Sequence, residues 1–208
     1  ADIMLRPEEI RENLIKMTKI FHYGSLSLTN EPVRTATRKA VGIAEEAGVI
    51  ISFDPNLRKP LWKTEALARE QIEYGVRHCQ VLKISDDELV WFTGKEDFDQ
   101  AAEYMQTQYH IPLLLISMGS RAYCGEQRAE IPAFLNPHTI ETTGAGDTFM
   151  GCMLHQILDR GFRNLTKTDM EEMLQLANAA ASLITTKRGA LRVMPAKQEI
   201  KDYLSAFC

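Results

Sequence analysis

The chain has 208 residues, of which 45% are hydrophobic and 25% charged, a composition that excludes disordered and fibrous proteins and suits one domain with a sizeable core. Its formal net charge is −4, from 24 Lys and Arg against 28 Asp and Glu, which argues against nucleic acid or an anionic lipid surface as a partner. Its apolar runs, such as residues 113–116, are too short to span a bilayer.

The chain alternates between helical and strand-like hydrophobic periods. These periods predict helices over residues 7–18, 32–47, 64–78 and 97–108, and strands over residues 20–23, 49–53, 80–84 and 112–117. Residues 123–141 are broken by Gly125, Pro132 and Pro137 and predict a short β-meander. Three helices are expected at the end, over residues 146–160, 169–186 and 196–207. This order predicts an α/β fold with a mostly parallel sheet, in a single domain over residues 1–208.

The helix expected over residues 7–18 shows the helical hydrophobic period most clearly. Ile10, Leu14 and Met17 lie at helical spacing and would form its apolar face.

The four cysteines are Cys79, Cys124, Cys152 and Cys208, and none forms a Cys-x-x-Cys pair. Scattered thiols in a chain without a basic-then-apolar start predict reduced cysteines in a cytoplasmic protein.

Ligands of a doubly wound sheet collect where the strands end. The most informative run is residues 142–149, in which Gly144, Ala145 and Gly146 lead directly into a helix. A glycine-rich helix start offers free backbone N–H groups to an anion, and Asp147 in the first turn would suit a general base. Taken alone, an Asp in the first turn after a glycine turn is also common as a purely structural helix start.

Two other phosphate motifs are excluded. A Rossmann fingerprint needs a small residue where Phe149 stands, and the Gly94-Lys95 pair lacks the Ser or Thr of a Walker loop because Glu96 follows it.

Residues 142–149, TTGAGDTF, resemble the second signature of the ribokinase-like (pfkB) sugar kinases. Other segments resemble that family in the same order: residues 52–58 (its DPNLR loop), 83–94 (the strand and helix that face Mg–ATP), 116–119 (the adenine-side strand end), and Asn178 with residues 189–190 (the closing nucleotide loop). Residues 21–28 and 60–62 resemble its fructokinase branch in particular. Essentially the whole chain is covered.

The resemblance implies a ribokinase-like three-layer αβα sandwich that transfers the γ-phosphoryl group of ATP to a sugar hydroxyl. Fructose, giving fructose 6-phosphate, is the expected sugar, with Mg²⁺ as the expected cation and K⁺ as a second candidate. Asp147 would be the base, and the backbone of Gly144, Ala145 and Gly146 would form the anion hole. The nucleotide would contact Ser85, Ser117, Gly119, Thr143, Asn178 and Gly189.

Four further residues have a role implied by the resemblance and a structural alternative. Asn56 and Arg58 would contact substrate or phosphate, although Arg58 could simply cap a turn. Glu88 would meet a Mg²⁺-bound water, although an acidic helix start serves the helix dipole equally well. Glu141 stands where the family usually has Asp, near a monovalent cation.

The family's Gly-Gly-x-x-x-Asn sugar motif and its N-terminal lid strands are not found, since residues 1–60 contain no Gly-Gly pair. We therefore expect a C-terminal nucleotide-binding and catalytic portion whose activity alone is in doubt. An exposed sheet edge or apolar face would invite a homodimer. The alternative is a non-catalytic protein, derived from a sugar kinase, that binds a nucleotide or a partner.

Overall fold

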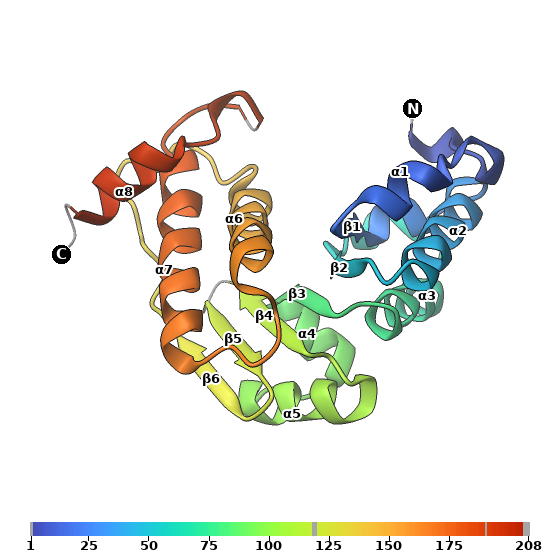
Figure 1. Ribbon diagram of the computed structural model, residues 1–208, viewed down its shortest axis with the longest axis horizontal. Helices are drawn as coiled ribbons and strands as arrows, with labels where there is room; N and C mark the ends of the chain where they lie inside the picture. Colours follow the sequence, from blue (N-terminus) through green and yellow to red (C-terminus); the bar gives the residue numbers. More distant parts are fainter. Residues whose placement is uncertain (1, 118–119, 190, 206–208) are drawn as a thin grey trace. The chain divides into compact units, whose positions relative to one another are not determined.

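The computed structural model describes residues 2–117, 120–189 and 191–205 and divides into two compact units, residues 1–115 and 116–208 (Figure 1). Strand order follows the chain, β1-β2-β3-β4-β5-β6. The pairs β1–β2 and β2–β3 are parallel, and the pair β5–β6 is antiparallel. The expected α/β fold is confirmed, while the expectation of a single domain stays a prediction.

The first unit alternates strands with helices. Its regular elements are η1 (Asp2–Met4), η2 (Pro7–Glu9), α1 (Glu12–Met17), β1 (Ile20–Gly24), η3 (Ser25–Leu28), α2 (Val33–Glu46), β2 (Ile50–Asp54), η4 (Lys59–Leu61), α3 (Glu65–Arg77), β3 (Val81–Ser85), α4 (Asp86–Thr93), α5 (Phe98–Tyr109) and the first part of β4 (Leu113–Ser117), whose last two residues belong to the second unit. The strands agree with the predicted ranges to within one residue at each end.

Strands β1 and β2 carry aromatic side chains on one face and polar ones on the other. Tyr23 and Phe53 lie side by side in the β1–β2 register, with ring centroids 4.9 Å apart. Helix α3 packs on this face, because a Cβ at Gly75 would lie 2.3 Å from the Phe53 ring. The preceding residue on each strand, His22 and Ser52, points to the opposite face of the sheet. There the Nδ1 atom of His22 lies 3.1 Å from the Ser52 hydroxyl, which fits a structural role for this histidine.

The single helix expected over residues 7–18 is wrong. The structure has η2 and then α1, and Ile15 is the buried residue, whereas Met17 is 81% exposed. The cause is a local polar bond: the Glu9 carboxylate accepts a hydrogen bond from the Arg6 N–H at 2.8 Å and caps a separate short helix. The extended backbone at Ile10 then ends η2 before α1 begins.

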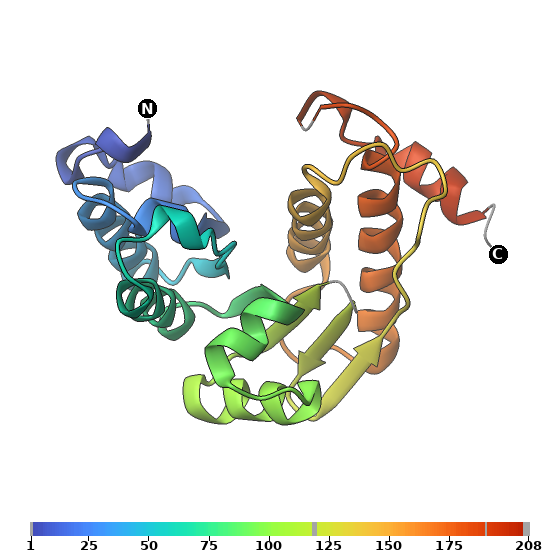
Figure 2. The same cartoon turned by 180° about the vertical axis from the view of Figure 1, so that it is seen from behind.

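The second unit is built on two long helices that lie side by side in both Figure 1 and Figure 2, α6 (Ala145–Arg160) and α7 (Lys167–Ile184). Its other elements are β5 (Arg121–Cys124), β6 (Gln127–Glu130), η5 (Leu191–Val193) and α8 (Lys197–Ser205). Met153, Ile157 and Met173 are fully or almost fully buried in this unit. The Gln156 side chain donates to the Met173 carbonyl at 3.1 Å, which satisfies a buried polar group.

The expected meander is confirmed only in its first part. Strands β5 and β6 form a hairpin that turns at Gly125, where φ is 56°. Residues 131–144 form neither helix nor strand. Cys79, Cys124 and Cys152 are free thiols, and Cys208 lies outside the described residues. Among the described residues, no helix is both long and apolar enough to cross a membrane.

Candidate active site

Helix α6 begins at a glycine turn. Gly144 has a φ of 83°, a left-handed conformation that favours glycine, and the Ala145 N–H donates to the Thr142 carbonyl at 3.1 Å. The first helical bond runs from the Thr148 N–H to the Gly144 carbonyl at 2.8 Å. Within the described ranges the N–H groups of Gly146 and Asp147 have no hydrogen-bond acceptor. Two free amides at the positive end of a 16-residue helix form a potential anion site.

A cavity of about 370 Å³ adjoins this turn, and all of its walls belong to the second unit. It is lined by Ser117, Ser120, Ala133, Phe134, Leu135, Asn136, Thr139, Thr142, Ala145, Gly146, Phe149, Asn178, Ala181, Ser182 and Thr185. Four predicted site residues therefore come together here: Ser117, Ala145, Gly146 and Asn178. Thr143 and Gly189 are exposed and do not line it, and Gly119 lies outside the described residues.

Asn178 holds one wall of this cavity in place. Its side chain is buried, with 6% of the residue exposed. Its Oδ1 accepts a hydrogen bond from the Ser120 hydroxyl at 2.6 Å, and its Nδ2 donates to the Pro132 carbonyl at 3.3 Å. Asn178, predicted to contact the nucleotide, thus also connects α7 to the segment after β6 by a hydrogen bond. The sequence gives Ser120 no role, because its positive φ of 45° is visible only in the structure.

A second set of bonds fixes residues 139–141 against the end of α7. The Ile140 N–H donates to the Thr185 carbonyl at 2.8 Å, and the Glu141 N–H donates to the same oxygen at 3.2 Å. The hydroxyls of Thr139 and Thr185 lie 3.1 Å apart. These bonds place Glu141 by its backbone and leave its half-buried carboxylate without a described partner.

Asp147 lies in the first turn of α6 and is exposed. In the described part of the chain its carboxylate has no hydrogen bond or ion pair, so it is free to accept a proton from an incoming group. Groups of three or more His, Cys, Asp or Glu that could hold a metal ion are absent from the described residues. The roles of Glu88 and Glu141 toward cations therefore stay predictions.

The first unit holds the other predicted residues around a cavity of about 490 Å³. Its walls are Asn56, Leu57, Arg58, Lys59, Ser85, Asp87, Glu88 and Trp91. The structure thus brings Asn56, Arg58, Ser85 and Glu88 together, from the loop after β2 and the start of α4.

Glu88 ties these two segments together. Its Oε1 accepts from the Leu57 N–H at 2.5 Å, and its Oε2 accepts from the Ser85 N–H at 2.9 Å. The Ser85 hydroxyl in turn accepts from the Glu88 N–H at 3.3 Å, which completes a capping box at the start of α4. Glu88 therefore has a structural role at the start of α4, and each of its oxygens keeps a lone pair for a further donor.

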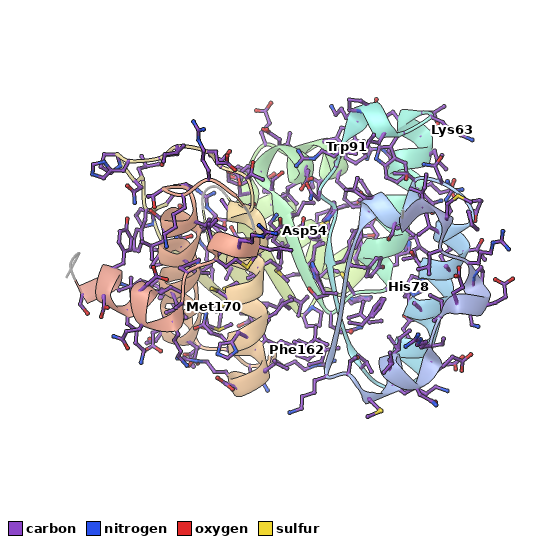
Figure 3. The ribbon with its side chains drawn as sticks, turned by 90° about the horizontal axis from the view of Figure 1, so that it is seen from above. Asp54, Lys63, His78, Trp91, Phe162 and Met170 are labelled. Carbon is purple, nitrogen blue, oxygen red and sulfur yellow. The ribbon has the colours of Figure 1, made fainter. Side chains whose placement is uncertain are left out.

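An ion pair that sequence reasoning missed lies beside this loop. The Lys83 ammonium is 2.8 Å from the Asp54 carboxylate, and the two side chains are only 9% and 8% exposed. Burial raises the pKa of Asp54, and the Lys83 charge opposes that rise. Asp54 is labelled in Figure 3, and its Oδ1 has no partner among the described residues. The parallel register, which places residues 52 and 53 beside 81 and 82, would have predicted the pair.

The chain was compared with known proteins. A family described as pfkB family carbohydrate kinase matches residues 2–197. The chain is 38% identical to "Probable fructokinase-4" of Arabidopsis thaliana over 207 residues, which covers 98% of this chain and 63% of that protein. It is 37% identical to "Fructokinase-2" of Solanum lycopersicum over 202 residues, or 96% of this chain and 61% of that protein. The chain thus spans about three fifths of these relatives.

Solved structures agree on the fold. Fructokinase from Vibrio cholerae O395, in a fructose-, ADP- and calcium-bound form, superposes with a TM-score of 0.84 at 25% identity, covering 98% of this chain and 66% of that one. Fructokinase from Xylella fastidiosa with bound ATP gives 0.86 at 25% identity, covering 100% and 67%. The ribokinase-like fold expected from the sequence is confirmed, and the chain belongs to the pfkB family of carbohydrate kinases.

Proposed function

We propose that this chain carries the nucleotide-binding and catalytic part of an ATP-dependent sugar kinase, and that its reaction converts fructose to fructose 6-phosphate. One observation carries the proposal: the first turn of α6 holds the free amides of Gly146 and Asp147 together with the unpaired Asp147 carboxylate. Relatives named fructokinase, and a solved fructokinase with bound fructose and ADP, support the choice of substrates.

The chemistry follows from this arrangement. Asp147 accepts the proton of a sugar hydroxyl while the sugar oxygen bonds to the γ-phosphorus of ATP and the bond to the bridging oxygen of ADP breaks. The helix start stabilises negative charge on the transferring group, which is the main requirement of phosphoryl transfer. When bound, Mg²⁺ would neutralise charge on the phosphates. The lone pairs left on Glu88 suit a metal-bound water better than direct ligation, because both oxygens already accept backbone N–H groups.

Replacement of Asp147 tests the base. We expect Asp147→Asn to lower the rate of fructose phosphorylation by about 10²- to 10⁴-fold, because a positioned base contributes that much. Isothermal titration should show ATP–Mg binding within about twofold of the parent chain, since the amides remain. Asp159→Asn is the matched control, because Asp159 is exposed near the other end of the same helix. Equal rates for the parent chain and Asp147→Asn would remove the assignment.

The same assays separate the alternative function. A chain that binds ATP–Mg and fructose but transfers no phosphoryl group between them would be a nucleotide-binding protein without turnover. We also propose K⁺ as a cation near Glu141. ATP affinity should then be higher in potassium chloride than in choline chloride, and Glu141→Ala should abolish that difference. The expected homodimer and cytoplasmic location stay predictions.

A further inference from the structure

The last helix of the second unit, α8, packs on the C-terminal half of α7. Ile200 is 5% exposed, and Tyr203 and Leu204 follow it one helical turn later, on the same face. These three side chains pack with Ala179 and Ala180 of α7. The ribbon shows α8 beside α7 in both views (Figures 1 and 2). The helical period of α8 therefore brings Tyr203 against α7.

The Tyr203 hydroxyl connects two segments that are distant in the sequence. It lies 3.0 Å from the Ser182 hydroxyl of α7 and accepts a hydrogen bond from Asn136 Nδ2 at 3.4 Å. Ser182 and Asn136 both line the cavity of about 370 Å³ beside α6, and Tyr203 is not one of its described walls. Tyr203 therefore lies outside this cavity and contacts two of the residues that form it.

Asn136 carries this contact into the loop over residues 131–144. Its Oδ1 accepts a hydrogen bond from the His138 N–H at 3.0 Å. Its carbonyl accepts from the Thr139 N–H at 3.1 Å and from the Thr139 hydroxyl at 2.8 Å. The loop forms neither helix nor strand, so such bonds take the place of a regular backbone ladder. Asn136 thus closes a turn with its Oδ1 and its carbonyl, while its Nδ2 fixes that turn to α8.

We propose that Tyr203 is a positioning residue for the nucleoside part of ATP. This inference rests on the proposed function, which assigns ATP to the second unit. The free amides at the start of α6 suit the phosphates, and the adjoining cavity, with Phe134 and Phe149 among its walls, suits a flat base and its ribose. The Tyr203 hydroxyl holds Asn136 and Ser182 in place before the nucleotide arrives. Less conformational entropy is then lost on binding.

Removal of the hydroxyl alone tests this role. Tyr203→Phe keeps a ring against α7 and takes the shared partner away from Asn136 and Ser182. In isothermal titration we expect the Kd for adenosine and the Kd for ATP–Mg to rise about threefold to tenfold, as when one hydrogen bond is lost. The Kd for inorganic tripolyphosphate with Mg²⁺ should stay within about twofold, because the helix-start amides remain. A general loss of stability would weaken all three ligands alike.

Two sets of variants make the test specific. Tyr123→Phe is the matched control, because Tyr123 is the other tyrosine of the second unit and is not one of the described cavity walls. It should leave all three Kd values unchanged. In a chain that already carries Asn136→Ala and Ser182→Ala, Tyr203→Phe should change the adenosine Kd less than about twofold, because the residues through which it acts are gone.

Four results would overturn this role and leave the kinase proposal in place. They are an adenosine Kd unchanged by Tyr203→Phe, equal weakening of adenosine and tripolyphosphate, an equal effect of Tyr123→Phe, and an undiminished effect of Tyr203→Phe in the Asn136→Ala, Ser182→Ala chain. A parent chain that binds neither adenosine nor ATP–Mg would remove both proposals. The two kinds of failure are therefore distinguishable.

Discussion

At the scale of the residue, Gly75 on α3 shows how closely the first unit packs. A Cβ at this position would lie 2.3 Å from the Phe53 ring, and Phe53 is fully buried between its neighbours. We expect Gly75→Ala to lower the free energy of unfolding by about 1–3 kcal/mol, the usual cost of overpacking a core. Urea unfolding followed by circular dichroism measures it, and Phe53→Leu in the same chain should recover part of the loss.

Gly42 on α2 is the matched control for this substitution. Its added Cβ would meet nothing within 4 Å, so Gly42→Ala should raise the free energy of unfolding by about 0.5–1 kcal/mol through helix propensity alone. Equal effects of the two substitutions would show that the contact with Phe53 is not the cause.

The buried pair of Asp54 and Lys83 makes stability depend on pH. Lys83→Met removes the cation and leaves the carboxylate buried, so the pKa of Asp54, already raised by burial, rises further. A raised folded pKa means that stability is greatest when the group is protonated and is lost as the pH rises through that pKa. We expect a loss of about 3–5 kcal/mol at pH 8 and a smaller loss at pH 5. Adding Asp54→Asn should remove the pH dependence, and a pH-independent loss would contradict this account.

At the scale of the element, α7 begins at Lys167 with Thr166 as its N-cap, two residues before the start that its hydrophobic pattern predicts. Thr166 and Asp169 form a capping box, with the Asp169 N–H donating to the Thr166 hydroxyl at 3.1 Å. Hydrogen bonds from Thr166 and the Arg160 charge lower the pKa of Asp169. Thr166→Ala should cost about 1 kcal/mol at pH 7, whereas Thr166→Ser should cost little. The difference should shrink as the pH falls below about 4, where Asp169 becomes protonated and its part of the box is lost.

Particular elements show what could be predicted from the sequence. Helix α3 was placed to within a residue because Thr64 is a strong N-cap, and α2 because Gly48 adopts the left-handed conformation that ends a helix. Residues 7–18 do not form the single helix that the hydrophobic period predicts, because the Arg6 N–H bonds to the Glu9 carboxylate and caps a separate short helix. The glycine turn at the start of α6 can be predicted from the sequence, because it involves only neighbouring residues. The bonds of Asn178 to Ser120 and Pro132 were not, since they join segments 58 and 46 residues apart.

At the scale of the whole molecule, ATP–Mg binding should stabilise the unit that holds its site. A ligand at 100 times its Kd adds about 2.7 kcal/mol to the folded state. The bonds that carry the cavity wall, from Ile140 and Glu141 to Thr185 and from Asn178 to Pro132, all lie in the second unit. Hydrogen exchange should therefore slow most at residues 139–148 and along the last turns of α7.

Two controls make this measurement specific. Mg²⁺ without ATP should leave the exchange of residues 139–148 unchanged, because the free amides of Gly146 and Asp147 attract an anion. Asn178→Ala should weaken the protection by ATP and also raise basal exchange near Pro132, because its amide no longer holds that carbonyl. Protection by ATP–Mg that is confined to residues 1–115 would contradict the placement of the nucleotide on α6, since those residues contribute nothing to the cavity beside that helix.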